Sequence, residues 1–291
     1  MPLPRALLLS ALLGAAAAPA LALPPGARKD LPPPPTEATP YVATSEKADP
    51  ALHAAVESGS RPDADRARDL YRHPEKSLMF WGLRPGMAVV DLQPGGGYWT
   101  QILAPYALAT HGTYTAAGSE KSRPGFEGKY SDKARFGIVK YVTFDGASPP
   151  FAAPASVDFV LTSRELHNWI DGGYMDRAMA QAYAALKPGG VLAIEEHRAD
   201  PKPMLKGASN GYVSTDVAMT AATKAGFKLD GASEINANPK DTKDYPYGVW
   251  TLPPTRQGPK AGEAPAFGYD RAKYDAIGES DRMTLRFRKP G

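Results

Sequence analysis

The sequence contains no cysteine among its 291 residues. Disulfide bonds, a thiol nucleophile and lipid attachment through an N-terminal cysteine are therefore excluded, and stability must come from the hydrophobic core. An excess of one charge is also lacking, because 34 Lys and Arg face 31 Asp and Glu without any block of like charges. This balance does not indicate binding to nucleic acid or to a membrane surface.

Residues 1–22 have the pattern of a cleaved secretory signal. Arg5 supplies the positive charge, residues 6–18 are apolar, and Ala20-Leu21-Ala22 is an A-x-A cleavage site. The apolar run is short and rich in alanine, which favours a cleaved signal over the alternative of an uncleaved anchor. No later run is long and apolar enough to span a bilayer. We therefore expect a periplasmic or secreted protein without stable membrane insertion after cleavage.

The rest of the chain divides by composition. Residues 23–48 contain runs of proline, typical of an extended tether. Residues 49–291 are enough for one large α/β domain, in which 49–86 have helical patterns. Residues 235–281 are polar and rich in Pro and Gly, which indicates an insertion that is either a lid or a surface excursion packed by its own aromatics.

Strand and helix patterns alternate through most of this domain, as expected for a parallel sheet covered on both faces. A helix is expected at 174–186, followed by a glycine-containing turn at 187–190. The expected strands lie near residues 88–92, 113–117, 139–144, 157–161, 191–195, 227–234 and 283–288.

The most informative stretch is residues 89–97, VVDLQPGGG, where a short strand breaks into a glycine loop that opens an expected helix at 98–107. Such a loop lets the backbone approach a ligand, and the helix start favours an anionic group. One alternative is a tight turn that binds no ligand. Another is a dinucleotide site, because Gly95-x-Gly97-x-x-Thr100 approximates the dinucleotide-binding fingerprint and Glu120 lies where a ribose-binding acid is required. Thr100, however, breaks this fingerprint.

Four segments in order carry a resemblance to a known family: 89–97, Phe144-Asp145-Gly146, Leu166-His167-Asn168 and the LKPGG run at 186–190. Together they resemble class I S-adenosylmethionine-dependent methyltransferases, and especially an exported bacterial group. The resemblance implies an α/β fold, a Rossmann-like doubly wound sheet of seven mostly parallel strands with an antiparallel last strand. It also implies S-adenosylmethionine as cofactor, in preference to a nicotinamide dinucleotide.

The same resemblance implies which residues contact the methyl donor. Superfamily members usually have glycine where Gln93 stands, and the acid expected at the end of the second strand is missing, so that Glu120 is the nearest substitute. The implied contacts are Asp91, Gln93, Gly95, Gly96 and Gly97 at the methionine end, Tyr98 stacked on the donor or shielding its cation, Glu120 at the ribose and Asp145 at the adenine, with Gly146 and Leu166 as further donor contacts.

Catalytic candidates follow the fourth and fifth expected strands, at the edge where open α/β sheets bind ligands. His167, beside Glu165, has the residue type of a general base, and His197 is a second candidate. Each histidine has the alternative role of ordering its loop through hydrogen bonds. The five histidines are dispersed in the sequence without a metal-binding spacing, so we expect no metal site.

These observations favour in-line methyl transfer to a small or envelope-associated acceptor. A non-catalytic scaffold of the same fold is the alternative, because the ribose acid is missing and an exported protein is separated from the cytoplasm where the donor is made. Nicotinamide-dependent oxidoreduction is a further alternative. The sequence predicts neither the acceptor nor the oligomeric state.

Overall fold

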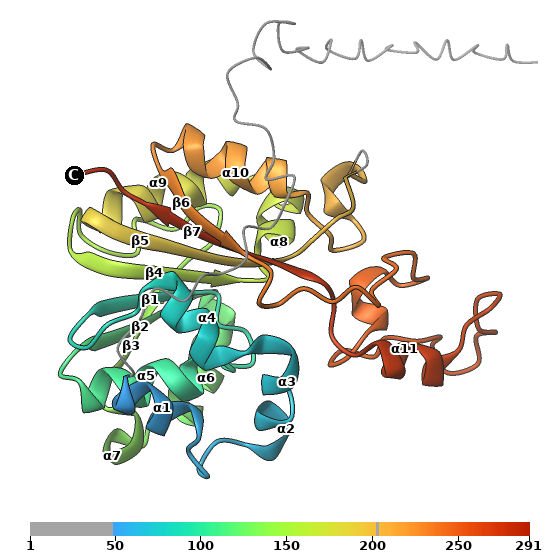
Figure 1. Cartoon of the computed structure of the whole chain (residues 1–291), viewed down its shortest axis with the longest axis horizontal. Helices are drawn as coiled ribbons and strands as arrows, with labels where there is room; N and C mark the ends of the chain where they lie inside the picture. The colour runs from blue at the N-terminus through green and yellow to red at the C-terminus, as the bar shows by residue number, and fades with distance from the viewer. Residues whose placement is uncertain (1–48, 202–203) are drawn as a thin grey trace, which may run out of the picture. The chain divides into compact units, whose positions relative to one another are not determined.

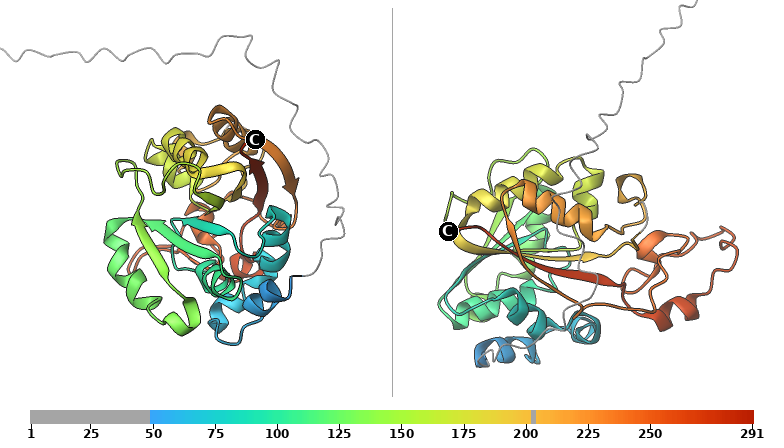
Figure 2. Two further views of the ribbon diagram at one scale, coloured as in Figure 1. Left: turned by 90° about the vertical axis from the view of Figure 1, so that its left-hand side faces the viewer. Right: turned by 45° about the horizontal axis from the view of Figure 1, so that its top comes forward.

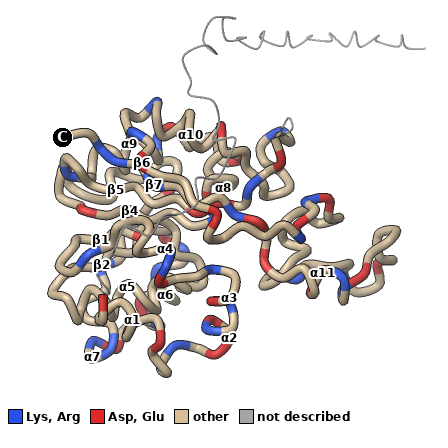
Figure 3. Tube along the Cα trace, viewed as in Figure 1, with Lys and Arg blue, Asp and Glu red and all other residues tan. Residues whose placement is uncertain are grey.

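The structure is a computed structural model that describes residues 49–201 and 204–291. The signal and the tether expected at residues 1–22 and 23–48 lie outside these ranges. Within them, no helix has both the length and the apolar composition needed to cross a membrane. Charges of both signs are interspersed along the described trace (Figure 3).

Seven strands form one sheet in the order β3-β2-β1-β4-β5-β7-β6 (Figure 1). Strands β1 to β5 are mutually parallel, while β7 is antiparallel to both β5 and β6. This confirms the doubly wound, mostly parallel sheet with an antiparallel last strand. The strands are β1 (Ala88–Leu92), β2 (Thr113–Gly118), β3 (Val139–Thr143), β4 (Val157–Ser163), β5 (Leu186–His197), β6 (Lys228–Ser233) and β7 (Arg282–Arg288).

Helices cover both faces of the sheet (Figures 1 and 2). Side chains of a strand alternate between faces, so Val90 and Val160 join the core under α8, α9 and α10, whereas Val89 and Phe159 join the core under α1, α4 and α5. The helices are α1 (Pro50–Val56), α2 (Asp63–Arg66), α3 (Asp69–Arg72), α4 (Pro74–Trp81), α5 (Thr100–Ala109), α6 (Arg123–Lys129), α7 (Lys133–Phe136), α8 (Leu166–Asp171), α9 (Met175–Ala185), α10 (Thr215–Lys224) and α11 (Arg271–Ile277), with short 3-10 turns at Glu120–Ser122, Lys206–Ala208 and Gly248–Thr251.

Two local expectations differ from the structure. The helix expected at 98–107 begins only at Thr100, because the glycine loop continues as turns through Trp99. The turn expected at 187–190 lies inside β5, where Gly189 donates to the carbonyl of Lys289 and Lys289 donates to that of Gly190. Pairing with the chain after β7 therefore overrides the local turn preference.

The insertion expected at 235–281 packs on a small core of its own. It contains α11 and a 3-10 turn, and its buried side chains are Tyr245, Val249, Leu252, Tyr274 and Ile277, joined by Tyr212 from the preceding segment. This agrees with an excursion packed by its own aromatics, while a lid function stays a prediction.

Candidate functional site

The candidate site lies where the strand order reverses, between β1 and its two neighbours β2 and β4. Open α/β sheets bind ligands at this point, outside the carboxyl ends of the strands. The glycine loop after β1, the segment after β4 and the end of β5 all reach this edge because the three strands are parallel. Segments that are distant in the sequence are thus brought together.

The glycine loop leaves part of its backbone open. A β-carbon added at Gly95 or Gly96 would meet no atom within 4 Å, so an anionic group can approach the backbone there. Gly97 has φ +82°, and a β-carbon there would lie 1.8 Å from the hydroxyl oxygen of Tyr130. Gly97 is therefore required by packing, whereas the open backbone at Gly95 and Gly96 fits the carboxylate end of a methyl donor.

Gln93 enters the site in a left-handed conformation with φ +53°. Its side-chain oxygen accepts a hydrogen bond of 2.5 Å from the indole nitrogen of Trp169, and its amide nitrogen lies 3.4 Å from the hydroxyl of Tyr174. The side chain therefore bridges the loop to α8 and to the start of α9. The bulky side chain at this loop position therefore has a structural role.

Asp91 is buried on the α5 side of β1 and accepts a hydrogen bond of 2.9 Å from Tyr114. Tyr114 also contacts the hydroxyl of Thr100 at 2.8 Å. Burial raises the pKa of Asp91 to about 7, against the effect of the Tyr114 hydrogen bond. Asp91 thus ties β1 to β2 and α5, and its contact with the donor stays a prediction.

Tyr98 and Trp99, the two aromatic residues after the loop, are both buried, although helical spacing predicts that only one of them points inward. Trp99 packs edge-on against Trp81. Tyr98 donates to Asp69 at 2.6 Å, and the guanidinium carbon of Arg72 lies 4.5 Å from its ring centre. The structure therefore places Tyr98 in the contact between the loop and α3 rather than on the face open to a ligand.

The residues implied for the ribose and the adenine lie near β2 and β3. Glu120 is exposed, and hydrogen bonds from Arg123 and then Thr143 lower its pKa to about 2. Asp145 accepts from the backbone N–H groups of Ala147 and Ser148. The carboxylate of Glu120 is thus hydrogen-bonded to neighbouring side chains, and that of Asp145 is hydrogen-bonded within a turn. Their contacts with the donor stay predictions.

A cavity of about 600 Å³ lies at this edge, with Asp145, Arg123 and Tyr141 in its wall. Gly146 follows Asp145, and a β-carbon there would lie 3.2 Å from the Tyr174 ring. Leu166, also implied as a donor contact, has its side chain fully buried in the core instead.

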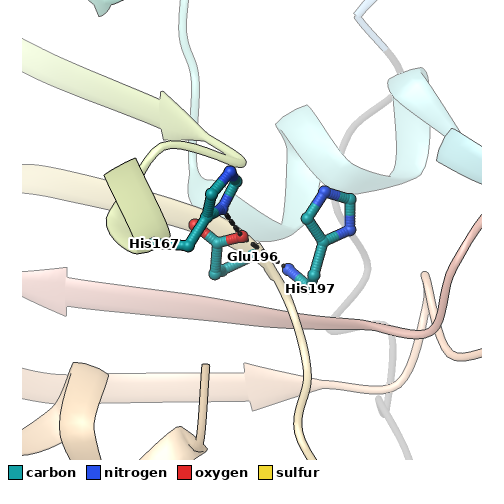
Figure 4. A group of neighbouring side chains, drawn as sticks. All are labelled: His167, Glu196 and His197. Atoms are coloured by element: carbon teal, nitrogen blue, oxygen red, sulfur yellow. Dashed lines mark hydrogen bonds and ion pairs between the residues drawn. The ribbon is translucent and has the colours of Figure 1, made fainter. Parts of the chain in front are cut away.

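His167 and Glu196 form the centre of the site (Figure 4). The His167 Nδ1 lies 3.1 Å from the Glu196 carboxylate, which also accepts the N–H groups of Leu166 at 2.6 Å and of His197 at 2.8 Å. Burial lowers the pKa of His167, but the charge and hydrogen bond of Glu196 outweigh this and raise it above the ordinary value. The pair has the geometry of a base held by a carboxylate.

The second candidate, His197, lies beside the first, with ring centres 5.6 Å apart. Its Nδ1 is 2.5 Å from the hydroxyl of Ser280, which belongs to the insertion. Burial and the nearby charge of His167 hold its pKa well below the ordinary value. The cationic form of His197 is therefore disfavoured, and its ring is positioned by the insertion.

Glu165 is half-buried, and its carboxylate accepts from the side chain of Asn168 at 2.8 Å. Burial raises the pKa of Glu165 to about 7. The structure thus brings all three catalytic candidates to one place, since Glu165 is electrostatically coupled to His167 and Glu196.

Potential metal ligands also converge here. His167, Glu196 and His197 each offer a ligand atom, and these atoms lie within 4.8 Å of one another. Both oxygens of Glu196 already accept hydrogen bonds, so the carboxylate is engaged with the protein. The expectation of no metal site stays a prediction.

Beside the histidines lies a group of arginines that surround two buried carboxylates, and no sequence pattern indicated this group. Arg282 donates to Glu195 at 2.6 Å and to Glu279 at 2.7 Å, and Arg72 donates to Glu279 at 2.8 Å. Arg164 follows β4 directly, in a left-handed conformation with φ +63°. The one available signal was the pair of acids, Glu195 and Glu196, at the end of an otherwise apolar strand.

One family model matches part of the chain. Residues 90–194 match the family described as a methyltransferase domain, which spans β1 to β5 and includes the glycine loop, His167 and Arg164. No curated protein matches the chain.

Solved structures resemble the chain at low identity. The crystal structure of the [4+2]-cyclase SpnF has a TM-score of 0.53 and 18% identity, covering 78% of this chain and 81% of that one. A SAM dependent methyltransferase from Aquifex aeolicus has a TM-score of 0.47 and 18% identity, covering 65% and 94%. One from Mesorhizobium loti has a TM-score of 0.46 and 16% identity, covering 74% and 96%. The SpnF likeness supports the fold.

Proposed function

We propose that the chain is a class I S-adenosylmethionine-dependent methyltransferase, since residues 90–194 match a methyltransferase domain, and that it transfers a methyl group to a small or envelope-associated acceptor. The observation that carries this proposal is the buried His167–Glu196 pair at the carboxyl edge of β4 and β5. Bound S-adenosylmethionine supplies an electrophilic methyl group on a positively charged sulfur. Gly95 and Gly96 are the backbone positions suited to its carboxylate, and Asp145 is suited to its adenine.

His167 is the base in this proposal. With Nδ1–H donating to Glu196, the Nε2 lone pair is free to take the proton of an oxygen or nitrogen nucleophile on the acceptor. The nucleophile forms a bond to the methyl carbon while the S–CH₃ bond breaks and its electron pair stays on sulfur. The products are the methylated acceptor, S-adenosylhomocysteine and a protonated His167, which then loses its proton to solvent.

Donor binding is tested first, by calorimetry on the folded, purified protein with S-adenosylmethionine and S-adenosylhomocysteine. Binding of either at or below millimolar concentration is the expected result, and absence of both would contradict the proposal. Asp145→Ala should weaken S-adenosylhomocysteine binding. An unchanged affinity would remove Asp145 from the adenine site.

Transfer is tested with radiolabelled donor and an envelope extract. His167→Asn should lower the labelling rate about 100-fold or more, as expected on losing a general base. His111→Asn is the matched control, because His111 is exposed and its left-handed φ of +58° is tolerated by Asn. Equal labelling by both variants would exclude His167 as the base.

A second candidate function is a non-catalytic binding protein with the same fold. It is favoured by one observation, the Gln93 side chain that bridges to Trp169 and Tyr174 beside the loop. Donor binding without any labelling of the extract, in wild type and variants alike, would support this candidate over methyl transfer.

We also propose that the protein is exported. The support is the sequence pattern of residues 1–22, with Arg5 before an apolar run and Ala20-Leu21-Ala22 at its end. Residues 23–48 would then tether the domain at the start of the mature chain, and the segment at 235–281 would act as a lid over the site.

A further inference from the structure

A group of largely buried arginines lies beside the histidine pair, and several of them share one carboxylate. Glu279 accepts hydrogen bonds from Arg68, Arg72 and Arg282, while Glu195 accepts from Arg282. Arg164 is coupled electrostatically to both carboxylates. Glu279 therefore accepts hydrogen bonds from three guanidinium groups.

Several of the N–H groups in this cluster have no acceptor. Within residues 49–201 and 204–291, the Arg72 Nη1 and Nη2 and the Arg164 Nε are buried without a hydrogen-bond partner. The Arg72 side chain is 0% exposed. The ring of Tyr98 packs against it, but the Tyr98 hydroxyl donates its hydrogen bond to Asp69 and does not pair with Arg72. An unpaired buried donor is costly, so these groups are suited to an acceptor that a ligand brings.

The balance of charge indicates the kind of ligand. Arg68, Arg72 and Arg282 all pair with Glu279, while Arg282 also pairs with Glu195 and Arg68 lies 3.4 Å from Asp65. Three guanidinium groups therefore converge on one carboxylate. Burial, and next the charge of Arg164, lower the pKa of Arg72 to about 9. A single negative charge placed here would relieve this repulsion.

Most of the cluster lies away from the residues implied for the ribose and the adenine, although Arg72 packs on the ring of Tyr98, a residue implied for the donor. Arg164 follows β4, Glu195 lies near the end of β5 and Arg282 begins β7, so the cluster lies on the β4–β5–β7 side of the switch point. The residues implied for the ribose and adenine lie at β2 and β3, on the other side. Arg164 lies three residues before His167, and its backbone N–H donates to the carbonyl of Glu195, whose neighbour Glu196 holds the His167 ring. The cluster therefore adjoins the base.

We propose that Arg72 and Arg164 bind a carboxylate group of the methyl acceptor and hold the acceptor beside His167. This inference rests on the proposed methyl transfer and narrows its acceptor to a carboxylate-bearing molecule. The carboxylate is the anchor, and a second group on the same molecule is the nucleophile. The left-handed backbone of Arg164, an uncommon conformation for a residue with a long side chain, is consistent with a functional position.

The anion site is tested with sodium formate as the probe, because formate is the smallest carboxylate. The Tm of the wild-type protein is measured in formate and in chloride at equal ionic strength. At ten times its Kd, formate should raise the Tm by about 3–6 °C. Arg164→Met should lose this increment without losing the fold, since its side chain makes no hydrogen bond among the described residues. Arg84→Met, which removes an exposed arginine, should retain it.

A second measurement separates the acceptor from the donor. S-adenosylhomocysteine carries a carboxylate, whereas 5′-methylthioadenosine lacks the whole amino-acid end. The proposal expects both to bind Arg164→Met with wild-type affinity. A tenfold or larger loss of S-adenosylhomocysteine affinity with unchanged 5′-methylthioadenosine affinity would assign the cluster to the donor and overturn the proposal.

The outcomes are distinguishable. No formate increment in the wild-type protein, or an equal increment in Arg164→Met, would overturn the anion site itself. Absence of S-adenosylhomocysteine binding by the wild-type protein would overturn methyl transfer, and the acceptor assignment with it. The formate measurement would still decide whether the anion site exists, because it does not involve the donor.

Discussion

At the scale of single residues, Glu196 organises the site. Its carboxylate accepts two backbone N–H groups and the Nδ1 of His167, so it fixes the start of α8 and the orientation of the imidazole together. A carboxylate that orients a histidine also stabilises the imidazolium that forms when the histidine accepts a proton. The role of Glu196 is therefore that of a positioning residue.

Glu196→Gln should lower the pKa of His167. The glutamine oxygen can still accept a backbone N–H, but the negative charge that raises the pKa is lost. NMR titration of the imidazole signals, assigned with His167→Asn, measures the change. Glu75→Gln is the matched control, since Glu75 is 3.0 Å from His53 in an exposed pair. The control should change the titration of His53 alone, and an unchanged His167 in Glu196→Gln would contradict the assignment.

Asp91 predicts how stability depends on pH. Its pKa is about 7 in the folded protein and 3.8 as its ordinary value, so between these values the folded state holds a proton that the unfolded state has released. The stability from Asp91 is therefore fully present below pH 3.8 and is lost as the pH rises towards 7. Asp91→Asn should remove a downward slope of up to about 1.4 kcal/mol per pH unit. Urea unfolding between pH 4 and 7 measures it, and equal slopes in both proteins would refute it.

At the scale of elements, the glycine loop combines open and packed positions. A β-carbon at Gly96 meets nothing, whereas one at Gly97 would overlap Tyr130, a residue of the segment between α6 and α7. Gly97 therefore sets how closely this segment packs on the loop, and Gly96 leaves room for a ligand.

Gly97→Ala should destabilise the fold by about 2–4 kcal/mol, because the left-handed backbone and the overlap with Tyr130 both add strain. Gly96→Ala should change the free energy of unfolding by no more than about 0.5 kcal/mol. Urea denaturation of both variants provides the measurement. Similar stabilities of the two variants would contradict the prediction and show that the Tyr130 side chain moves away at little cost.

The elements themselves were largely predictable from the sequence. Every expected strand is present, because buried strands and their flanking turns leave a strong local pattern. The extension of β5 back to Leu186 was not predictable, since the LKPGG run is extended by pairing with the segment at Lys289. Local sequence favours a turn there, and only the three-dimensional partner decides otherwise.

At the scale of the whole molecule, the site shows the limit of sequence patterns. His167 and His197 were candidates individually, but their proximity depends on β4 lying beside β5. The arginine cluster combines α3, β4, β5 and the approach to β7, and no periodicity connects these segments. Buried charges are recognised only when their partners are known.

Export predicts the first residue of the mature protein. If the signal is cleaved after Ala22, the intact mass of protein isolated from the periplasm or medium should correspond to a chain that starts at Leu23. Replacing Ala22 with Leu should block cleavage, because the site requires small residues. Recovery of the uncleaved chain from the wild-type gene would contradict the prediction.

The ion pairs of Glu279 also constrain how the chain folds. Arg68 and Arg72 meet a carboxylate that lies 211 and 207 residues later in the chain. Contacts of such long sequence separation form slowly, because the intervening chain must be brought together first. Arg72 in α3 therefore has no carboxylate partner until Glu279, just before β7, is in place. The end of the chain therefore completes the charged interior, and a nascent chain that has not yet reached Glu279 leaves Arg72 without its carboxylate partner.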